Sequence, residues 1–388
     1  MKTHSSPTAV FARSLLTCAL GAAFAQGTLA QERSGILEEI VVTAEHREAS
    51  LQETQISITA FSGETLTDLG ISSGLDLSQY VPNLTAQPFV GGRTGVGFNI
   101  RGVGDFETLI TFDPAVSVYL DNVLIAKNTG ALLDVLELER IEVLRGPQGT
   151  LYGRNTMGGA VNYITKNPSN EFEGSLNLSV GNYGRRDIRG MLNVPLLGAD
   201  SPIGELNLRV NAASLNRDGI QTNRYEPVGQ SELGTVDRDV ARIHLLWRPV
   251  DNVDIKYSYD RTRIDEIPQT VWVTGTNVIG AGPFVAPYTE KESRRPRGGY
   301  FNAEHRGVTD VDGHSLTAAW HINDNLTLHA ITGYREMENY STSDSDGTPL
   351  ALLATEDLQS YDSLSQEFRA VGTALDERLD YSMGIYYM

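Results

Sequence analysis

The chain has 388 residues, a formal net charge of −18 and a hydrophobic content of 40%. The excess of acidic residues argues against a nucleic-acid-binding protein, because the neutralisation of phosphates requires a basic surface. No stretch of the sequence reaches the ~18 to 20 apolar residues of a membrane-spanning helix, which excludes a helical membrane protein and leaves a membrane β-barrel possible.

Residues 1–25 have the pattern of a secretory signal peptide. A basic start is followed by the short apolar core SLLTCALGAAFA, which ends in a small-x-small cleavage pattern at residues 23–25. A second candidate cleavage site ends at Ala30. The one cysteine, Cys18, lies inside this segment, so we expect a mature chain without disulfides, thiol catalysis or cysteine-bound metal.

Residues 45–168 are rich in glycine and mix short helical and strand patterns, which predicts a compact α+β domain. The stretch SGETLTDLGI at 62–71 predicts a short helix that is capped by Ser62 and ends at Gly70. VSVYLDNV at 116–123 predicts a strand that runs into an Asp-Asn turn, and a further strand is expected at residues 141–144.

Residues 171–388 repeat strands in which apolar and polar side chains alternate. In EFEGSLNLSV, for example, Phe172, Leu176 and Leu178 lie on one face and charged or hydroxyl side chains on the other. The pattern predicts nine strands, at residues 171–180, 188–194, 205–212, 241–247, 253–260, 315–322, 326–334, 367–370 and 379–387.

Two features of these strands favour a membrane barrel over a soluble β-sandwich, which stays the alternative. Aromatic residues gather toward strand ends, as expected for membrane-interface girdles: Trp247, Tyr257, Tyr259, Trp320, Tyr334, Tyr386 and Tyr387. Long loops at 217–237, 264–310 and 339–360 alternate with tight turns, as in outer-membrane barrels. Because such barrels close with an even number of strands, nine strands predict the N-terminal part of a longer barrel.

Each candidate motif for catalysis or for cofactor binding lacks residues that the motif requires. Gly95-Val96-Gly97 lacks the third glycine of a dinucleotide loop, and the glycines at 153 and 158 are followed by Gly159-Ala160 where a phosphate loop needs Lys and Ser or Thr. The histidines are scattered, and no serine lies in a Gly-x-Ser-x-Gly elbow. We therefore predict no catalytic residue, no cofactor and no metal site, and a protein that is not an enzyme.

Four segments occur in the order seen in TonB-dependent outer-membrane receptors, and the chain resembles that family. They are EEIVVTAEHR (38–47), FNIRGVGD (98–105), VSVYLDNV (116–123) and the glycine-rich ERIEVLRGPQGTLYGRNTMGGAVNYITKNP (139–168). The resemblance implies an α+β plug domain at 45–168, followed by an antiparallel transmembrane β-barrel. That barrel is incomplete in this chain, with about nine strands at 171–388 of an expected 22. The implied location is the outer membrane.

The segment at 38–44 is similar to the TonB box, which the energy-transducing protein TonB captures by strand addition. The residues implied are Glu39, Ile40, Val41, Val42, Thr43 and Ala44. The alternative is that this short β-prone run is the first strand of the plug.

The resemblance also implies roles for plug residues. Arg101, Arg140, Glu142 and Arg145 match charged plug positions that pair with barrel carboxylates in relatives. A plug inside a barrel must turn tightly and approach the wall closely, so glycine is expected to serve turns and packing at Gly102, Gly146, Gly149, Gly153, Gly158 and Gly159.

Ligand contacts are expected on apical plug loops and on the long barrel loops. The plug candidates are Phe89, Arg93, Phe106 and Phe112, and the barrel candidates are Arg294, Arg295, Arg297 and Tyr300 in KESRRPRGGYF. Guanidinium groups suit anionic chelates, but they equally suit lipopolysaccharide phosphates, and a solvated loop is a further alternative.

The function implied is active uptake of a scarce ligand, in the first place a ferric siderophore. Cobalamin, saccharides and other metal chelates stay open, as do a passive porin, a truncated fragment without transport and a soluble β-rich enzyme. The implied partners are TonB with its inner-membrane energising complex, an extracellular small molecule, and outer-membrane lipid with lipopolysaccharide.

Overall fold

The structure is a computed structural model that describes residues 41–43, 46–47, 49–52, 54–89, 95–106, 110–131, 136–270, 298–376 and 378–388. The chain divides into two compact units, Met1–Glu39 and Ile40–Met388. The predicted signal peptide and the first residues of the predicted TonB box lie outside the described residues, so the description below concerns the second unit.

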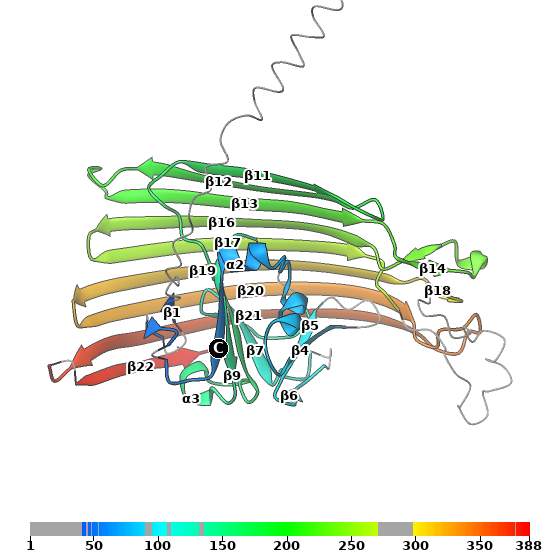
Figure 1. Cartoon of the computed structure of the whole chain (residues 1–388), viewed down its shortest axis with the longest axis horizontal. Coiled ribbons are helices and arrows are strands. Elements are labelled where there is room, and N and C mark those ends of the chain that lie inside the picture. The colour runs from blue at the N-terminus through cyan, green and yellow to red at the C-terminus, as the bar shows by residue number, and fades with distance from the viewer. Residues whose placement is uncertain are drawn as a thin grey trace, which may run out of the picture. The chain divides into compact units, whose positions relative to one another are not determined.

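The largest element is an antiparallel sheet of nine strands that follow one another in chain order (Figure 1). The strands are β11 (Glu173–Val180), β12 (Arg186–Leu197), β13 (Glu205–Arg217), β16 (Val236–Val250), β17 (Val253–Glu266), β19 (Arg306–Asn323), β20 (Leu326–Asp344), β21 (Ala354–Ala374) and β22 (Leu379–Tyr387). All nine strands predicted from the alternation of apolar and polar residues are confirmed.

Most of these strands are longer than the sequence pattern predicts, and β20 and β21 reach 19 and 21 residues. The alternation fades where outward side chains become charged, as at Arg261 and Asp312, but the backbone ladder continues through the pair Arg261↔Asp312. The loops shorten accordingly, since only residues 345–353 separate β20 from β21. A further small sheet, β15-β14-β18, forms from Glu232–Leu233, Gln221–Asn223 and Gly298–Gly299 beside the 3-10 turn η2 (Glu226–Val228).

The two faces of the barrel sheet have different environments. On β16 the polar Arg242 and His244 are 3% and 1% exposed, while their neighbours Ile243 and Trp247 are 37% exposed. The face that carries Arg242 and His244 contacts the plug and is called the plug-facing wall below. Tyr386 pairs with Glu367 on this face, so its predicted place in the outward aromatic girdle is wrong, whereas Tyr387 alternates to the outer face.

The plug is built on a mixed sheet with the strand order β3-β9-β10-β7-β8. Its strands are β3 (Ile58–Ser62), β9 (Leu138–Arg145), β10 (Gly159–Thr165), β7 (Val116–Leu120) and β8 (Val123–Ile125), and only the β10–β7 pair is parallel. Apolar side chains of this sheet, such as Ile141 and Val161, form the main core with residues of the flanking helices.

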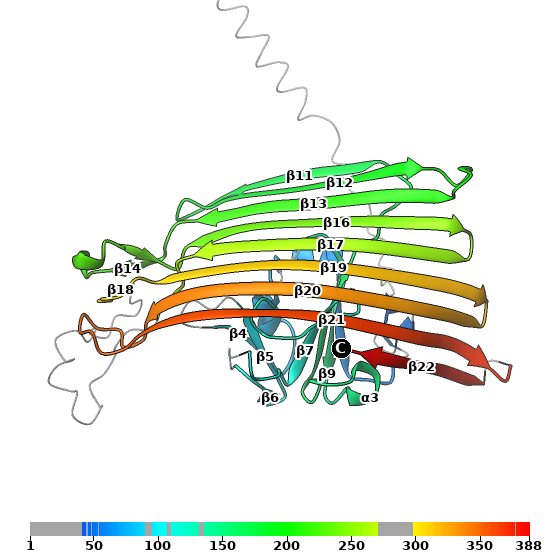
Figure 2. The same ribbon diagram turned by 180° about the vertical axis from the view of Figure 1, so that it is seen from behind.

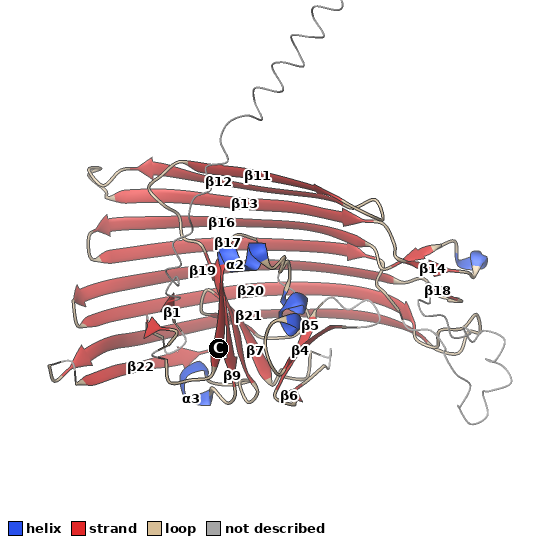
Figure 3. Ribbon diagram, in the orientation of Figure 1, coloured by secondary structure: helices blue, strands red, loops and turns tan. Residues whose placement is uncertain are grey.

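The described helices of the plug are short, and none belongs to the barrel sheet (Figure 3). They are α2 (Gly63–Asp68), the 3-10 helix η1 (Gly74–Gln79) and α3 (Gly149–Tyr152). The Ser62 hydroxyl accepts a hydrogen bond from the backbone N–H of Thr65, as predicted for the cap of this helix. The predicted turn at Asp121–Asn122 is also present, with both residues at positive φ.

Two smaller strand groups complete the plug. β4 (Leu84–Pro88), β5 (Val96–Ile100) and β6 (Val103–Gly104) form one sheet, and β1 (Val41–Val42) pairs with β2 (Ala49–Ser50). The view from behind shows β4, β5 and β6 toward the same end of the barrel strands as β14 and β18 (Figure 2). No helix within the described residues has the length and hydropathy needed to cross a membrane.

Candidate functional site

The described part of the predicted TonB box is held as a short strand against the plug. Val41 and Val42 pair antiparallel with Ser50 and Ala49. The side chain of Val42 is 1% exposed and packs in a small apolar cluster with Leu144 and neighbours, whereas Val41 is 44% exposed. Glu39, Ile40 and Ala44 lie outside the described residues.

Thr43 forms hydrogen bonds with the buried ion pair of Arg140 and Glu142 on strand β9. Its backbone N–H donates to Glu142 Oε1 at 2.7 Å, and its hydroxyl donates to the same oxygen at 3.2 Å. Arg140 Nε donates to Glu142 Oε1 at 2.8 Å, and Arg140 Nη2 donates to the Thr43 hydroxyl at 3.1 Å. The Glu142 side chain is fully buried, so these charge-assisted bonds lie away from water. We call Thr43, Arg140 and Glu142 the latch.

Among the described residues, the observed partners of the predicted plug charges lie within the plug. Arg140 pairs with Glu139 and Glu142 inside the plug rather than with barrel carboxylates. Arg101 donates to the Ser57 hydroxyl at 3.0 Å, also within the plug. The Nε of Arg145 is buried and has no hydrogen-bond partner among the described residues. Among the described residues Arg140 and Glu142 pair with each other on β9, which lies between β3 and β10, and the prediction of barrel partners stays a prediction.

Glu137 makes one plug–barrel ion pair that the sequence did not indicate. Its carboxylate accepts two hydrogen bonds from Arg209 on β13, one of them from Nε at 2.9 Å. Arg209 is fully buried, and it also donates to Glu173 at 3.2 Å and to Asn193 at 3.2 Å. Neither partner stands in a recognisable motif, and the two residues are far apart in sequence.

Asp121, in the turn between β7 and β8, makes another plug–barrel ion pair. Lys256 Nζ on β17 lies 3.1 Å from its carboxylate and donates to Asn167 at 3.0 Å. Burial by itself would raise the pKa of Asp121, but the positive charge of Lys256 and the hydrogen bonds from Thr165 outweigh it and bring that pKa to about 2. Asp121 is therefore ionised and fixed to the barrel near neutral pH.

His46 and Arg47, which follow the predicted TonB box, are both held in place by contacts. A ring nitrogen of His46 lies 2.8 Å from the carbonyl oxygen of Leu151, and its ring centroid lies 4.8 Å from that of Tyr152. Burial, with the positive charge of Arg369 next in importance, lowers the pKa of His46 to about 4. Arg47 forms an ion pair with Asp380 of β22. The segment at 41–43 is thus followed by a neutral, packed histidine.

The predicted turn and packing glycines differ in their φ angles and in the space that a Cβ would have. Positive φ occurs at Gly102, Gly146, Gly153 and Gly159. Gly159 combines a φ of +146° with contact to the neighbouring strand, since a Cβ there would lie 2.1 Å from the Leu144 carbonyl oxygen. A Cβ at Gly158 would lie 2.6 Å from the Val103 carbonyl oxygen, whereas at Gly149 it would meet nothing within 4 Å. The structure gives no reason for glycine at 149.

The predicted ligand-contact residues do not form one cluster among the described residues. Phe89 is 9% exposed and packs close to Gly95, so it is a packing residue in this structure. Phe106 and Phe112 are 39% and 53% exposed. Tyr300 follows β18, at the end of the small β14 sheet. Arg93, Arg294, Arg295 and Arg297 lie outside the described residues.

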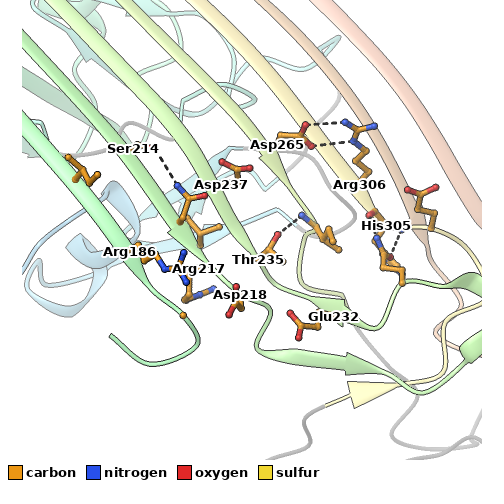
Figure 4. Close-up of a pocket in the computed structure, with 17 residues that line it drawn as sticks. Arg186, Ser214, Arg217, Asp218, Glu232, Thr235, Asp237, Asp265, His305 and Arg306 are labelled. Carbon is orange, nitrogen blue, oxygen red and sulfur yellow. Dashed lines mark hydrogen bonds and ion pairs between the residues drawn. The ribbon is translucent and has the colours of Figure 1, made fainter. Parts of the chain in front are cut away.

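A recess of about 780 Å³ lies at the loop ends of β12, β13, β16, β17 and β19 (Figure 4). Arg306 lines it and donates to Asp265 through Nη2 at 3.0 Å and Nε at 3.2 Å. Asp265 alternates with the buried Ile264, so this part of the recess belongs to the outer face of the sheet. That part of the recess therefore lies on the other face of the sheet from the plug. No group of three or more metal-ligating side chains occurs in the part of the chain that the structure describes.

Comparison with known proteins agrees with this arrangement. The family model of the TonB-dependent Receptor Plug Domain matches residues 50–160. The Pesticin receptor of Yersinia enterocolitica is 28% identical over 230 residues, which cover 59% of this chain and 32% of the relative. The Iron-regulated outer membrane virulence protein of Vibrio cholerae is 32% identical over 168 residues, 42% of this chain and 25% of the relative.

Solved structures share the fold. The ferric yersiniabactin uptake receptor FyuA from Yersinia pestis superposes with a TM-score of 0.71 at 21% identity, over 85% of this chain and 48% of that one. The siderophore receptor PiuA from Acinetobacter baumannii superposes with a TM-score of 0.67 at 16% identity, over 87% and 46%. The chain thus spans about half the length of these structures and about a quarter to a third of the curated relatives it matches.

Proposed function

Because this chain belongs to the TonB-dependent outer-membrane receptors, with a plug and part of the barrel, we propose that it takes up a scarce extracellular ligand with energy supplied through TonB. Its location is the outer membrane. The relatives are receptors, which points away from an enzyme. In the proposed cycle, ligand binds outside, the plug shifts, the box is released to TonB, and a path opens through the barrel.

The observation that carries this proposal is the state of residues 41–43. They form a β-prone strand whose attachment to the plug rests on few groups: the pair with β2, the buried Val42 and the Thr43 bonds of the latch. Strand addition by a partner requires free backbone N–H and C=O groups, and the Thr43 N–H is occupied by Glu142. Release of the latch would make the segment available for capture.

The ligand we propose in the first place is a ferric siderophore. Support comes from the names of similar proteins, among them the Catecholate siderophore receptor Fiu of Escherichia coli, which is 29% identical over 190 residues. The ligand candidates Phe106 and Phe112 are exposed plug residues. The carbonyl oxygen of Phe112 accepts a hydrogen bond from Lys127, which pairs with Asp113. We propose that the arginines at 294, 295 and 297, with Tyr300, contribute to recognition of an anionic chelate.

The remaining assignments belong to the same proposal. The partners are TonB with its inner-membrane energising complex, and outer-membrane lipid with lipopolysaccharide around the barrel. The domain limits we propose are a signal peptide at 1–25, with an alternative end at 30, a TonB box at 38–44, a plug at 45–168 and the barrel strands at 171–388.

The test is a proline in the proposed TonB box. Val41→Pro removes a backbone N–H from the segment, whereas Val41→Ala removes only an exposed side chain and serves as the matched control. We expect Val41→Pro to lower energised uptake of a ferric siderophore by at least about ten-fold, while binding to de-energised cells stays within about two-fold. Uptake by Val41→Pro at the level of Val41→Ala would overturn the role of this segment.

A further inference from the structure

Residues 146–158, which we call the α3 segment, join β9 to β10 and include the short helix α3. Backbone hydrogen bonds close the base of this segment. The Gly146 N–H donates to the Gly158 carbonyl oxygen, and the Gln148 N–H donates to that of Thr156, both at 3.0 Å. Beyond its base, the α3 segment contacts the residues that follow the proposed TonB box and, separately, the group around the ligand candidate Phe112.

The first of these contacts is with His46. The carbonyl oxygen of Leu151 lies 2.8 Å from Nε2 of His46, and the ring centroids of Tyr152 and His46 lie 4.8 Å apart. The backbone N–H of His46 donates in turn to the carbonyl oxygen of Thr43 at 2.8 Å. Thr43 belongs to the latch, so a shift of the α3 segment changes the support of the latch.

The second contact is the ion pair of Arg154 with Asp113, whose side chains are 53% and 40% exposed. Lys127 joins this group, since its Nζ donates to Asp113 Oδ1 at 2.9 Å and to the carbonyl oxygen of Phe112 at 3.2 Å. The side chains of Asp113, Lys127 and Arg154 together carry a net charge of +1. An anion that binds beside Phe112 therefore competes with Asp113 for the Arg154 guanidinium.

Between these two contacts, the α3 segment rests on strand β7. The Tyr119 hydroxyl donates to the carbonyl oxygen of Tyr152 at 2.7 Å, and the Ser117 hydroxyl donates to that of Asn155 at 2.9 Å. Both donors are buried. Packed and hydrogen-bonded groups thus connect Asp113 with His46 through the α3 segment, which is the physical requirement for coupling between two sites.

Gly149, the first residue of α3, has no role in the observed conformation. Its φ is not positive, and a Cβ would meet nothing within 4 Å. Glycine is less favourable than alanine in a helix, because it loses more backbone freedom on folding. A glycine that destabilises the observed turn without relieving a contact suits a turn that also unwinds.

We propose that the α3 segment couples the binding of an anionic ligand near Phe112 to the release of residues 41–43. The anion takes Arg154 from Asp113, α3 unwinds at Gly149, and His46 loses the Leu151 carbonyl group and the Tyr152 ring. The latch then has less support, and residues 41–43 leave the plug more often. The inference rests on the proposed function, because it assumes that these residues are released to TonB.

The first test changes Arg154 and measures labelling at Val42, in the full receptor. Val42 is 1% exposed, so Val42→Cys reacts with a maleimide when residues 41–43 leave the plug. Arg154→Gln imitates the loss of Arg154 to an anion and should speed this labelling about two- to five-fold, the range for a partly exposed ion pair. Arg154→Lys keeps the positive charge and should label close to the rate of the unaltered receptor.

Two controls separate coupling from general loosening. Ile141→Cys lies in the core of the plug and reports opening of the whole domain, so its slow labelling should not change with Arg154→Gln. Arg261→Gln removes a similarly exposed ion pair, with Asp312, from the outer face of the barrel and should leave labelling at Val42→Cys unchanged. An unchanged rate at Val42→Cys with Arg154→Gln, or an equal rise at Ile141→Cys, would overturn the coupling.

The second test concerns the unwinding of α3. A Cβ at residue 149 has room, so Gly149→Ala keeps the fold but restricts the backbone. Added to Arg154→Gln, it should slow labelling at Val42→Cys about two- to five-fold. An unchanged rate would contradict the unwinding.

Glu142→Gln distinguishes a failure of the coupling from a failure of the proposed function, because Glu142 bonds Thr43 directly. Faster labelling at Val42→Cys with Glu142→Gln but not with Arg154→Gln would refute the coupling alone. No change with either substitution would count against the release of residues 41–43 itself.

Discussion

Glu142→Gln is the substitution that tests the latch without unfolding the rest of the plug. Glu142 Oε1 accepts from the Thr43 N–H at 2.7 Å, while Oε2 is buried without a partner among the described residues. Glutamine keeps an acceptor oxygen in the place of Oε1 and removes the negative charge of the carboxylate. The plug loses a buried charge that was only half satisfied, so we expect the plug core to stay folded.

The size of the effect follows from the change in hydrogen-bond type. A bond to a charged acceptor contributes about 1.5 to 3 kcal/mol, and a neutral bond about 0.5 to 1.5 kcal/mol. The Thr43 N–H bond should therefore weaken by about 1 kcal/mol, which corresponds to a roughly five-fold larger population of the released box. The bond between Arg140 and the Thr43 hydroxyl, at 3.1 Å, is retained and limits the effect.

The released population can be measured by thiol labelling. Val42 is 1% exposed, so Val42→Cys should react with a maleimide only when the segment leaves the plug. Adding Glu142→Gln should speed labelling about five-fold. Glu139→Gln is the matched control, because Glu139 contacts Arg140 but not Thr43. Ile141→Cys, in the core of the plug, should label at an unchanged slow rate. An unchanged rate at Val42→Cys, or an equal rise with Glu139→Gln, would refute the latch.

Three further predictions concern the plug and its contacts. Arg209→Met should lower the stability of the seated plug by about 2 to 3 kcal/mol in urea titrations, because it removes the buried guanidinium that pairs with both Glu137 and Glu173. Glu137→Gln leaves Arg209 with Glu173 and should cost about 1 kcal/mol, and equal effects of the two substitutions would contradict this order. Gly159→Ala should destabilise the plug by at least about 2 kcal/mol, and Gly149→Ala should be nearly neutral in the same assay. Because the pKa of His46 is lowered from 6.5 to about 4, the unfolded chain binds more protons between these values, so stability should fall as the pH drops from 6.5 toward 4. His46→Gln should flatten that part of the pH profile of thermal unfolding, and an unaltered slope would show that His46 is not responsible.

The barrel strands could be predicted from sequence because apolar and polar residues alternate along each strand, with one kind on each face of the sheet. In β16, Arg242 and His244 alternate with Ile243 and Leu245, and this local pattern is sufficient to find the strand. It does not give the ends of the strand, because backbone pairing continues where the outward residues turn polar. The inward place of Tyr386 was missed for a related reason, since the register of β22 is set by its partner β21.

The plug–barrel contacts could not be predicted because they depend on residues that are distant in the chain. Glu137 meets Arg209 and Asp121 meets Lys256 only after the plug has folded against the sheet. The resemblance directed attention to Arg140 and Glu142, but it did not indicate that the two residues pair with each other beside Thr43. Within the box, the β-prone run was visible in the sequence, whereas its attachment to Glu142 required the structure.

Uptake of radiolabelled ferric siderophores by iron-starved cells, compared between strains with and without TonB, tests the proposed function most directly. The strains express this receptor as their only candidate for the siderophore tested, and a strain that lacks the receptor sets the background. We predict accumulation of iron above background only where both TonB and the receptor are present. Equal accumulation with and without TonB would contradict the account.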